Sequence, residues 1–389
     1  MPSPGRRGLD LANGVADRRH RLRRSVTFAV LALFVVAATA NGLAWYATSR
    51  LTRIDPVSDS YPLRVLAVGA GATTVTLSAG PDAAEPGTFR LAWQGGHAKA
   101  GSVVSSGPMY VTRELSQVVG KLSPGVMAGI EPDAFTGDPF SSLGIAFSTV
   151  AVSTQLGPMP AWWITGTRST WVILVHGLDG SRTDTLAVIP ALFALGFPIL
   201  AITYRNDAGA PNSPDRQSHL GATEWHDVEA AVAYAVAHGA SGVVLFGYSL
   251  GGAMAAVTAE DSPLGGRVSG LVLDSPILSW QATLDFQGAS HSFPQPLITL
   301  TESMLAWRTG MNYGRFDQLQ REATLRARVL LIQGSADTIV PPATAEAFFR
   351  ARPDLVAYLP VGGADHVSAI DTDPVGYRGA LSRFLSDYP

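Results

Sequence analysis

The spacing of hydrophobic and polar positions changes along the chain and divides it into regions. From about residue 144 to the C-terminus, short apolar runs such as WVILVHG (residues 171–177) alternate with longer amphipathic stretches such as TDTLAVIPALFAL (residues 183–195). Uninterrupted apolar runs are typical of strands that are covered on both faces. Regular alternation of strands and helices predicts a mostly parallel sheet with helices on both faces. We therefore predict an α/β domain over residues 144–389.

The pattern predicts the individual elements of this domain. The expected strands are IAFSTVAVS, MPAWWITG, WVILVHG, PILAITY, GVVLFGY, VSGLVLDS, RVLLIQG and VAYLPV. The expected helices cover residues 183–195, 223–238, 250–260, 343–352 and 374–388. Residues 276–324 interrupt the alternation, and we predict an irregular, cap-like insertion there. Its aromatic and aliphatic side chains are suited either to an acyl pocket or to ordinary core packing, and the sequence does not distinguish the two.

A different pattern precedes the α/β domain. Residues 61–115 consist of short alternating segments separated by glycine and proline, such as TTVTLSAG and TFRLAWQGG, which favours strands joined by hairpin turns. A stretch rich in proline, glycine and aspartate, EPDAFTGDPFSSLG, then separates the two regions. We predict a polar tether and a small β-rich module over residues 48–143.

The N-terminus carries a candidate membrane helix. Residues 25–47 contain the uncharged run VTFAVLALFVVAATANGLAWYA, which is about long enough to cross a bilayer. The basic sequence RRHRLRR precedes it, so residues 1–24 are expected to lie in the cytoplasm and the rest of the chain outside it. A secretory signal cleaved near Ala40 is the alternative, because Ala38-Thr39-Ala40 resembles a cleavage site.

Composition excludes several kinds of function. The 389-residue chain has 47% hydrophobic and 15% charged residues, a net charge of −3 and no cysteine. This charge provides no general attraction for nucleic acid, and the absence of cysteine excludes disulfides, thiolate metal sites and a cysteine nucleophile. The sequence does not indicate an oligomeric state.

Three candidate catalytic residues follow three predicted strands. Ser249 follows GVVLFGY, Asp337 follows RVLLIQG, and His366 follows VAYLPV. The carboxyl ends of parallel strands meet at one edge of a sheet, which is where such folds hold their reactive groups. Serine, histidine and aspartate together can form a nucleophile activated by proton transfer. Asp274 also ends a predicted strand, VSGLVLD, and remains an alternative to Asp337 as the acid.

The segment GYSLG, with an acid and then a histidine further along, resembles the nucleophile elbow of the α/β-hydrolases. The elbow requires small residues two positions from the serine, as Gly247 and Gly251 are. The helix expected from Leu250 directs that residue's N–H toward a developing oxyanion. The resemblance implies that Leu178, after His176-Gly177, supplies the second backbone donor and that His176 holds this loop in place.

The resemblance is nearest to membrane-tethered, monoacylglycerol-lipase-like and lysophospholipase-like serine esterases and lipases. It implies an α/β-hydrolase fold and the hydrolysis of small-molecule or lipid esters, with no metal and no cofactor. A serine peptidase similar to prolyl oligopeptidase and a non-catalytic binding protein remain alternatives. Arg205 and Asp207, in TYRNDAG, are expected to pair with each other and support their loop, and a role in substrate binding is the alternative.

Overall fold

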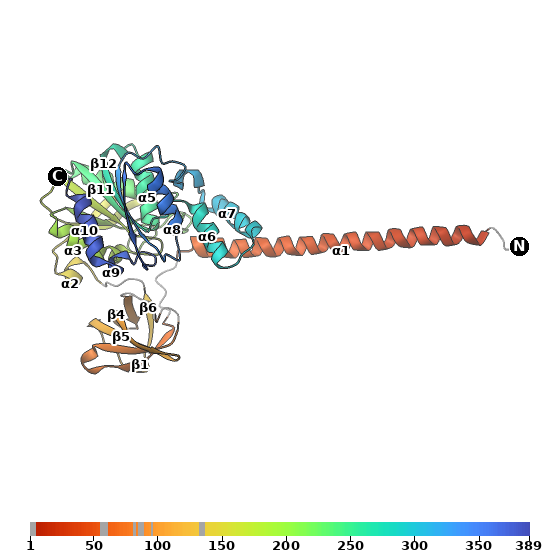
Figure 1. Cartoon of the computed structure of the whole chain (residues 1–389), viewed down its shortest axis with the longest axis horizontal. Coiled ribbons are helices and arrows are strands. Elements are labelled where there is room, and N and C mark those ends of the chain that lie inside the picture. The colour runs from red at the N-terminus through yellow and green to blue at the C-terminus, as the bar shows by residue number, and fades with distance from the viewer. Residues whose placement is uncertain (1–4, 55–60, 81–82, 85–88, 95, 132–136) are drawn as a thin grey trace.

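The computed structural model of the chain (Figure 1) describes residues 5–54, 61–80, 83–84, 89–94, 96–131 and 137–389. In its first helix the side chains are described from residue 27 onward, except that of residue 29. The described chain consists of a long N-terminal helix, a small barrel and an α/β domain. The predicted fold class and the β-rich module are confirmed.

Helix α1 (Gly5–Thr52) contains the apolar run of the N-terminus. Its segment Val30–Thr52 has 23 residues and a mean hydropathy of 1.7, so α1 is long and apolar enough to cross a membrane. A signal sequence near the N-terminus has the same length and composition. The predicted tether differs from the structure at its start. Residues 48–52 form the last turn of α1, and Thr48 and Thr52 are buried; residues 55–60 lie outside the described part.

The β-rich module is a closed barrel of six antiparallel strands in the order β1-β2-β5-β4-β3-β6. The strands are β1 (Leu63–Val68), β2 (Thr74–Ser78), β3 (Phe89–Trp93), β4 (Gly96–Gly107), β5 (Tyr110–Val119) and β6 (Met127–Glu131). Alternate residues point inward, as Val75 and Leu77 of β2 do, and form the apolar interior. Closure of the barrel leaves its strands without a free edge that could pair with another chain.

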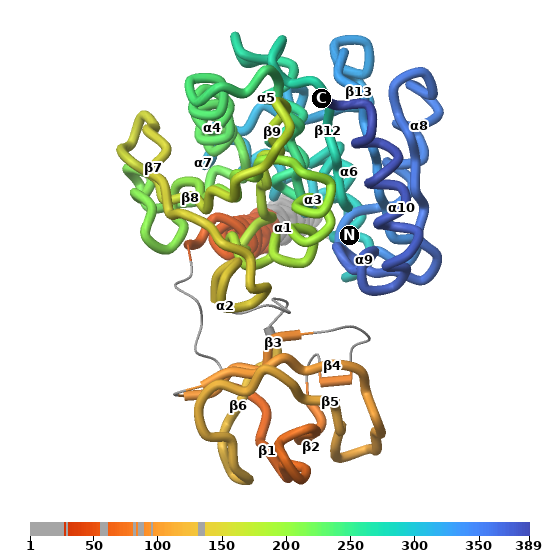
Figure 2. The backbone as a smooth tube through the Cα atoms, turned by 90° about the vertical axis from the view of Figure 1, so that its left-hand side faces the viewer, coloured from red at the N-terminus to blue at the C-terminus, as the bar shows by residue number. Residues whose placement is uncertain are grey.

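An eight-stranded sheet forms the centre of the α/β domain, in the order β14-β13-β12-β11-β9-β10-β8-β7. Its strands are β7 (Ser148–Thr154), β8 (Gly157–Ile164), β9 (Thr170–Val175), β10 (Ile199–Ile202), β11 (Gly242–Tyr248), β12 (Val268–Asp274), β13 (Arg328–Gly334) and β14 (Val356–Val361). The six strands from β9 to β14 pair in parallel, whereas β8 pairs antiparallel with β10 and with β7. Figure 2 shows β7 and β8 on one side of the domain and α8 on the opposite side.

Helices cover both faces of this sheet. They are α2 (Pro139–Leu143), α3 (Ile189–Ala194), α4 (Trp225–Ala237), α5 (Leu250–Asp261), α6 (Trp280–Ser290), α7 (Gln295–Thr309), α8 (Pro342–Ala351), α9 (Ala369–Thr372) and α10 (Pro374–Leu385). One apolar core joins the sheet to α4, α5 and α8, and a second joins its other face to α3 and α10. Successive residues of β9 supply both cores: Ile173 faces the first, and Val172 and Leu174 face the second.

Two predicted segments differ from the structure. The helix expected over residues 183–195 is a 3₁₀ segment (Arg182–Ala187) followed by the short α3, whose first turn contains Pro190. The insertion expected to be irregular forms the helices α6 and α7. Pro294 and Pro296 stand at the N-cap and in the first turn of α7, where proline is tolerated.

Candidate active site

Ser249 occupies a sharp corner between β11 and α5. Its backbone has φ 49° and ψ −114°, a conformation that costs a non-glycine residue about 1–3 kcal/mol. The corner leaves little room: a Cβ atom at Gly247 would collide with the carbonyl of Gly251, and one at Gly251 would collide with the carbonyl of Val175. Glycine is therefore required at both positions, and the corner holds the hydroxyl at the carboxyl edge of the sheet.

The structure brings Ser249, His366 and Asp337 together. The Nε2 atom of His366 lies 2.9 Å from the Ser249 hydroxyl, and its Nδ1 lies 2.9 Å from Oδ2 of Asp337. A proton on Nδ1 is donated to the carboxylate, which leaves Nε2 free to accept the serine proton. All three residues come from loops that follow parallel strands of one sheet.

The carboxylate of Asp337 is held in a fixed orientation. Its Oδ1 accepts the backbone N–H groups of Ile339 (2.9 Å) and Val340 (2.8 Å), and its Oδ2 accepts the Gln333 side-chain amide (2.8 Å). Asp337 is buried, so these bonds replace the water that the carboxylate loses on folding. These three donors fix the orientation of the carboxylate oxygen that faces His366. The sequence analysis did not predict any of them.

Asp274, the alternative acid, has other partners. It is completely buried and accepts hydrogen bonds from Tyr377 (2.8 Å) and Ser275 (3.2 Å). Burial raises the pKa of Asp274 to about 6, although these bonds oppose the change. The hydrogen bonds of His366 therefore favour Asp337 as its acid.

Asp365, adjacent to His366 in the sequence, joins two loops. It accepts the backbone N–H of Thr338 (2.8 Å), the Thr338 hydroxyl (3.0 Å) and the N–H of His366 (2.7 Å). Burial favours the neutral acid, but these bonds hold the pKa of Asp365 below its usual value. This carboxylate thus fastens the loop of His366 to the loop of Asp337.

A second histidine, His176, holds the loop that follows β9. Its Nε2 lies 2.8 Å from Oδ2 of Asp207 and its Nδ1 lies 2.9 Å from the carbonyl of Gly177. Burial alone would lower the pKa of His176, but the charge and hydrogen bond of Asp207 raise it to about 9, so the ring is a cation at neutral pH. The expected pairing of Arg205 with Asp207 is wrong: Arg205 instead forms a bidentate ion pair with Asp227, at 2.8 Å for each bond.

The same loop carries one of the two predicted backbone donors. The Gly177 carbonyl also accepts the Tyr204 hydroxyl at 2.6 Å and the Gly180 N–H at 3.3 Å, so three donors fix the peptide plane between Gly177 and Leu178. A trans peptide directs its N–H opposite to its carbonyl, away from these donors. In the described part of the chain, the N–H groups of Leu178 and Leu250 both lack a hydrogen-bond acceptor.

Comparison with known proteins identifies the family. Residues 170–294, which include Ser249, match the family described as "alpha/beta hydrolase fold". The chain is also 30% identical, over 260 residues, to an uncharacterized protein of Mycobacterium tuberculosis strain CDC 1551 / Oshkosh and to one of strain H37Rv. These alignments cover 64% of this chain and 82% of each relative. The chain belongs to the α/β-hydrolase family.

Solved structures agree with the α/β-hydrolase fold. An esterase of Pyrococcus furiosus matches with a TM-score of 0.53 and 20% identity, covering 65% of this chain and 95% of the esterase. A second crystal form gives a TM-score of 0.52 at the same identity, covering 65% and 94%. At this identity the likeness concerns the fold. Residues 64–131, which correspond to the barrel, match a family described as "Domain of unknown function (DUF8805)".

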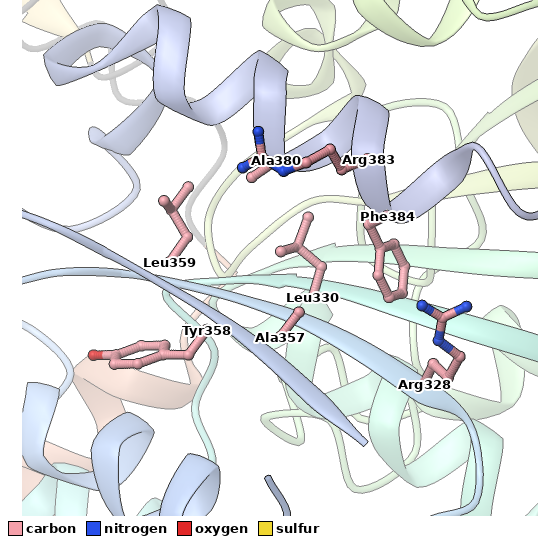
Figure 3. A pocket seen from close by; sticks show the side chains of 8 residues that line it. All are labelled: Arg328, Leu330, Ala357, Tyr358, Leu359, Ala380, Arg383 and Phe384. Atoms are coloured by element: carbon pink, nitrogen blue, oxygen red, sulfur yellow. The ribbon is translucent and has the colours of Figure 1, made fainter. Parts of the chain in front are cut away.

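A separate hollow lies at the far edge of the hydrolase sheet. It has a volume of about 220 Å³ and lies between β13, β14 and α10, with Leu330, Tyr358 and Phe384 in its lining (Figure 3). Ser249, His366 and Asp337 do not line this hollow. Within the described residues, moreover, no three histidine or carboxylate side chains are arranged to hold a metal ion.

Proposed function

We propose that the protein is a membrane-anchored serine hydrolase that cleaves carboxylic esters. The observation that carries the proposal is the continuous hydrogen-bonded series from Ser249 through His366 to Asp337 at the carboxyl edge of an α/β-hydrolase sheet. Serine alone is a weak nucleophile, and this series provides the base that it needs. The family and its esterase fold neighbours support the same reaction class.

The reaction would proceed through an acyl-enzyme. His366 removes the Ser249 proton as the oxygen attacks the ester carbonyl, and Asp337 stabilises the resulting imidazolium. His366 then gives this proton to the leaving alcohol, which departs as the acyl-enzyme forms. A water molecule repeats the two steps and releases the acid, so that serine and histidine return to their initial states.

The N–H groups of Leu178 and Leu250 are assigned to the oxyanion. Leu250 is the first residue of α5, so its N–H lies at the positive end of the helix dipole. The loop carrying Leu178 lies against Ser249: a Cβ at Gly177 would be 3.3 Å from the Ser249 Cβ and 4.0 Å from its hydroxyl oxygen. Removing one such donor typically costs about 3–4 kcal/mol of transition-state stabilisation.

The decisive experiment tests the nucleophile. The wild type should hydrolyse a short nitrophenyl ester and react with a fluorophosphonate, whereas Ser249→Ala should lose nearly all of both activities. Ser382→Ala is the matched control, because Ser382 is an exposed serine of α10. Comparable activity of Ser249→Ala and the control would refute the assignment. Cleavage of a prolyl peptide in preference to the ester would indicate a peptidase instead.

The proposal also assigns α1 as a single membrane span with the hydrolase domain on the extracytoplasmic side. The length of the apolar run and the arginines that precede it support this orientation. Because the chain has no cysteine, one cysteine can be introduced at a time. In intact cells, an impermeant maleimide should label Val375→Cys and should not label Asn13→Cys. The reverse labelling pattern would contradict this orientation. A mature protein that lacks residues 1–40 would indicate that a signal sequence is cleaved.

A further inference from the structure

Helix α1 does not end where its apolar run ends; it continues along the surface of the hydrolase domain. Its last three turns pack beside α7, and Figure 1 shows α6 and α7 next to the end of α1 that meets the domain. Ala44, Thr48 and Thr52, spaced four residues apart, form one buried face of α1. These small side chains let this end of α1 lie close against the hydrolase domain, and Thr52 also hydrogen-bonds Gln217 at 3.2 Å.

Arg308, at the end of α7, fastens the two helices together. Its Nη1 donates to the hydroxyls of Thr48 (2.9 Å) and Ser49 (2.7 Å), and its Nη2 donates to the Gln217 side chain (3.1 Å). Its guanidinium also lies 4.4 Å from the ring centre of Trp45. Among the described residues, this cation contacts hydroxyls, an amide and an aromatic ring, and no carboxylate pairs with it.

These contacts place part of α7 at the same level as the end of the apolar run. Trp45 and Tyr46 of α1 are 52% and 67% exposed, and Trp307, adjacent to Arg308, is 76% exposed. Tryptophan and tyrosine are favoured at the boundary between hydrocarbon and water, and an arginine there can contact lipid phosphates. The exposed aromatic side chains of α1 and α7 therefore match a single membrane boundary.

The pair of helices α6 and α7, with the connection between them, also reaches the candidate active site; we refer to residues 280–309 as the cap hairpin. The Gln287 amide of α6 donates to the carbonyl of Ile339 at 2.9 Å, in the loop that follows Asp337. Ile277, shortly before α6, donates its N–H to the carbonyl of Ser249 at 3.2 Å. The cap hairpin thus contacts α1 through α7 and the loop after Asp337 through α6, and the segment just before it contacts Ser249.

We propose that the cap hairpin lies on the membrane surface, held there by Arg308, and that the substrate is an ester whose acyl chain is embedded in that membrane. This inference rests on the proposed function, because it assumes that α1 spans a bilayer and that Ser249 cleaves esters. The membrane is the occupant that fits the exposed faces of Phe293 and Trp307, because the apolar span continues directly into the contact with α7. A soluble ester would gain nothing from this arrangement.

The location of the cap hairpin can be measured without any hydrolase activity. Single cysteines are introduced into the cysteine-free full-length chain at Phe293, Trp307, Val35 and Val375, and each is labelled with an environment-sensitive fluorophore in phosphatidylcholine–phosphatidylglycerol vesicles. Lipids that carry a nitroxide near the headgroup should quench the labels at 293 and 307. Val375→Cys, on α10 and 83% exposed in the native protein, is the control that should remain unquenched.

The label at Val35, inside the apolar run, separates the two hypotheses. Quenching at 35 by deep nitroxides, with labels at 293 and 307 quenched no more than the label at 375, would overturn the cap-hairpin proposal and leave the membrane span intact. No quenching at 35 would overturn both. Arg308→Gln should reduce quenching at 307 while leaving that at 35 unchanged, because the span would remain inserted without the connection to α7.

Hydrolysis then tests the substrate class. Trp307→Ser should lower turnover of a long-chain ester in vesicles by at least about fivefold, and change turnover of a soluble short-chain ester by less than about twofold. Val375→Ser should alter neither rate. Equal effects of Trp307→Ser on the two esters would overturn the assignment of a membrane-embedded substrate. Failure of the wild type to cleave either ester would overturn both the assignment of a membrane-embedded substrate and the proposed function. The quenching data would still show where the cap hairpin lies.

Discussion

Two histidine–aspartate pairs lie close to Ser249, and their geometries are almost the same. His366 contacts Asp337 at 2.9 Å and His176 contacts Asp207 at 2.8 Å. The difference is the partner of the second ring nitrogen. In His366 that nitrogen faces a hydroxyl, which can either donate or accept, whereas in His176 it faces a carbonyl, which can only accept.

The group that faces the second ring nitrogen determines whether each histidine can exchange a proton. His366 can alternate between the neutral and charged forms because the Ser249 hydroxyl is compatible with both, and its side chain is 19% exposed. His176 is completely buried and needs protons on both nitrogens to satisfy its two acceptors. The first pair is thus suited to proton transfer and the second to holding a loop, so a histidine–aspartate contact alone does not identify a catalytic site.

The largest effect should distinguish the two histidines. We expect His366→Gln to lower kcat for a short ester by about 10⁵-fold, because in the proposed mechanism His366 is the base that takes the serine proton. His176→Gln, which retains a donor, should lower kcat by about 10-fold to 100-fold through a misplaced oxyanion donor. The measurement is steady-state hydrolysis of a nitrophenyl ester. Losses of the same size in the two variants would remove the distinction between base and positioning residue.

The second largest effect should distinguish the carboxylates of Asp337, which follows β13, and Asp274, which ends β12. Asp337→Asn should lower kcat by about 10⁴-fold, because an amide facing Nδ1 favours the wrong histidine tautomer. Asp274→Asn should change kcat by less than about threefold, since Asp274 bonds to Tyr377 and Ser275 rather than to His366. A larger loss in Asp274→Asn than in Asp337→Asn would reassign the acid. Circular dichroism spectra of both variants show whether either has unfolded.

The sequence predicted the strands, and it predicted that Ser249, Asp337 and His366 meet at one sheet edge, because strand ends can be recognised from local pattern. Uninterrupted apolar runs such as GVVLFGY can be buried on both faces only in such a sheet, and the glycines around Ser249 are required by one tight corner. The order of the strands and the closure of the barrel depend on pairing between distant segments. Local periodicity carries no information about either.

The sequence was least informative where a residue has several possible partners. Asp207 follows Arg205 by two positions, which suggested a local pair, but each contacts a residue from another element, His176 or Asp227. Likewise, residues 276–324 interrupt the strand–helix alternation and were predicted to be irregular, but they form α6 and α7, with a proline in the first turn of α7, where proline is favourable. In both cases the three-dimensional environment, rather than nearness in sequence, determined the outcome.

The charge of His176 should appear as a pH dependence of stability. The pKa of His176 is about 9 in the folded protein against an ordinary value of 6.5, so the folded protein retains a proton that the unfolded chain loses between these values. The stabilisation, about 3 kcal/mol, is fully present below pH 6.5 and is lost as the pH rises through 9. Thermal unfolding should therefore show a larger fall in Tm between pH 6.5 and 9.5 for the wild type than for His176→Gln. Equal falls would contradict a buried cation at this position.

The smallest expected effect is that of removing one of the three donors to the Gly177 carbonyl, the Tyr204 hydroxyl. Tyr204→Phe removes the 2.6 Å hydrogen bond but keeps the ring that stacks on His176, with ring centres 4.3 Å apart. Because His176 and the Gly180 N–H still hold the carbonyl, we expect only about a tenfold loss, in kcat rather than KM, since in the proposed mechanism the Leu178 N–H acts mainly on the transition state. Tyr234→Phe is a control, because Tyr234 stacks on His238 in α4, away from the loop. A loss confined to KM would indicate that Tyr204 shapes the substrate pocket instead of positioning the oxyanion donor.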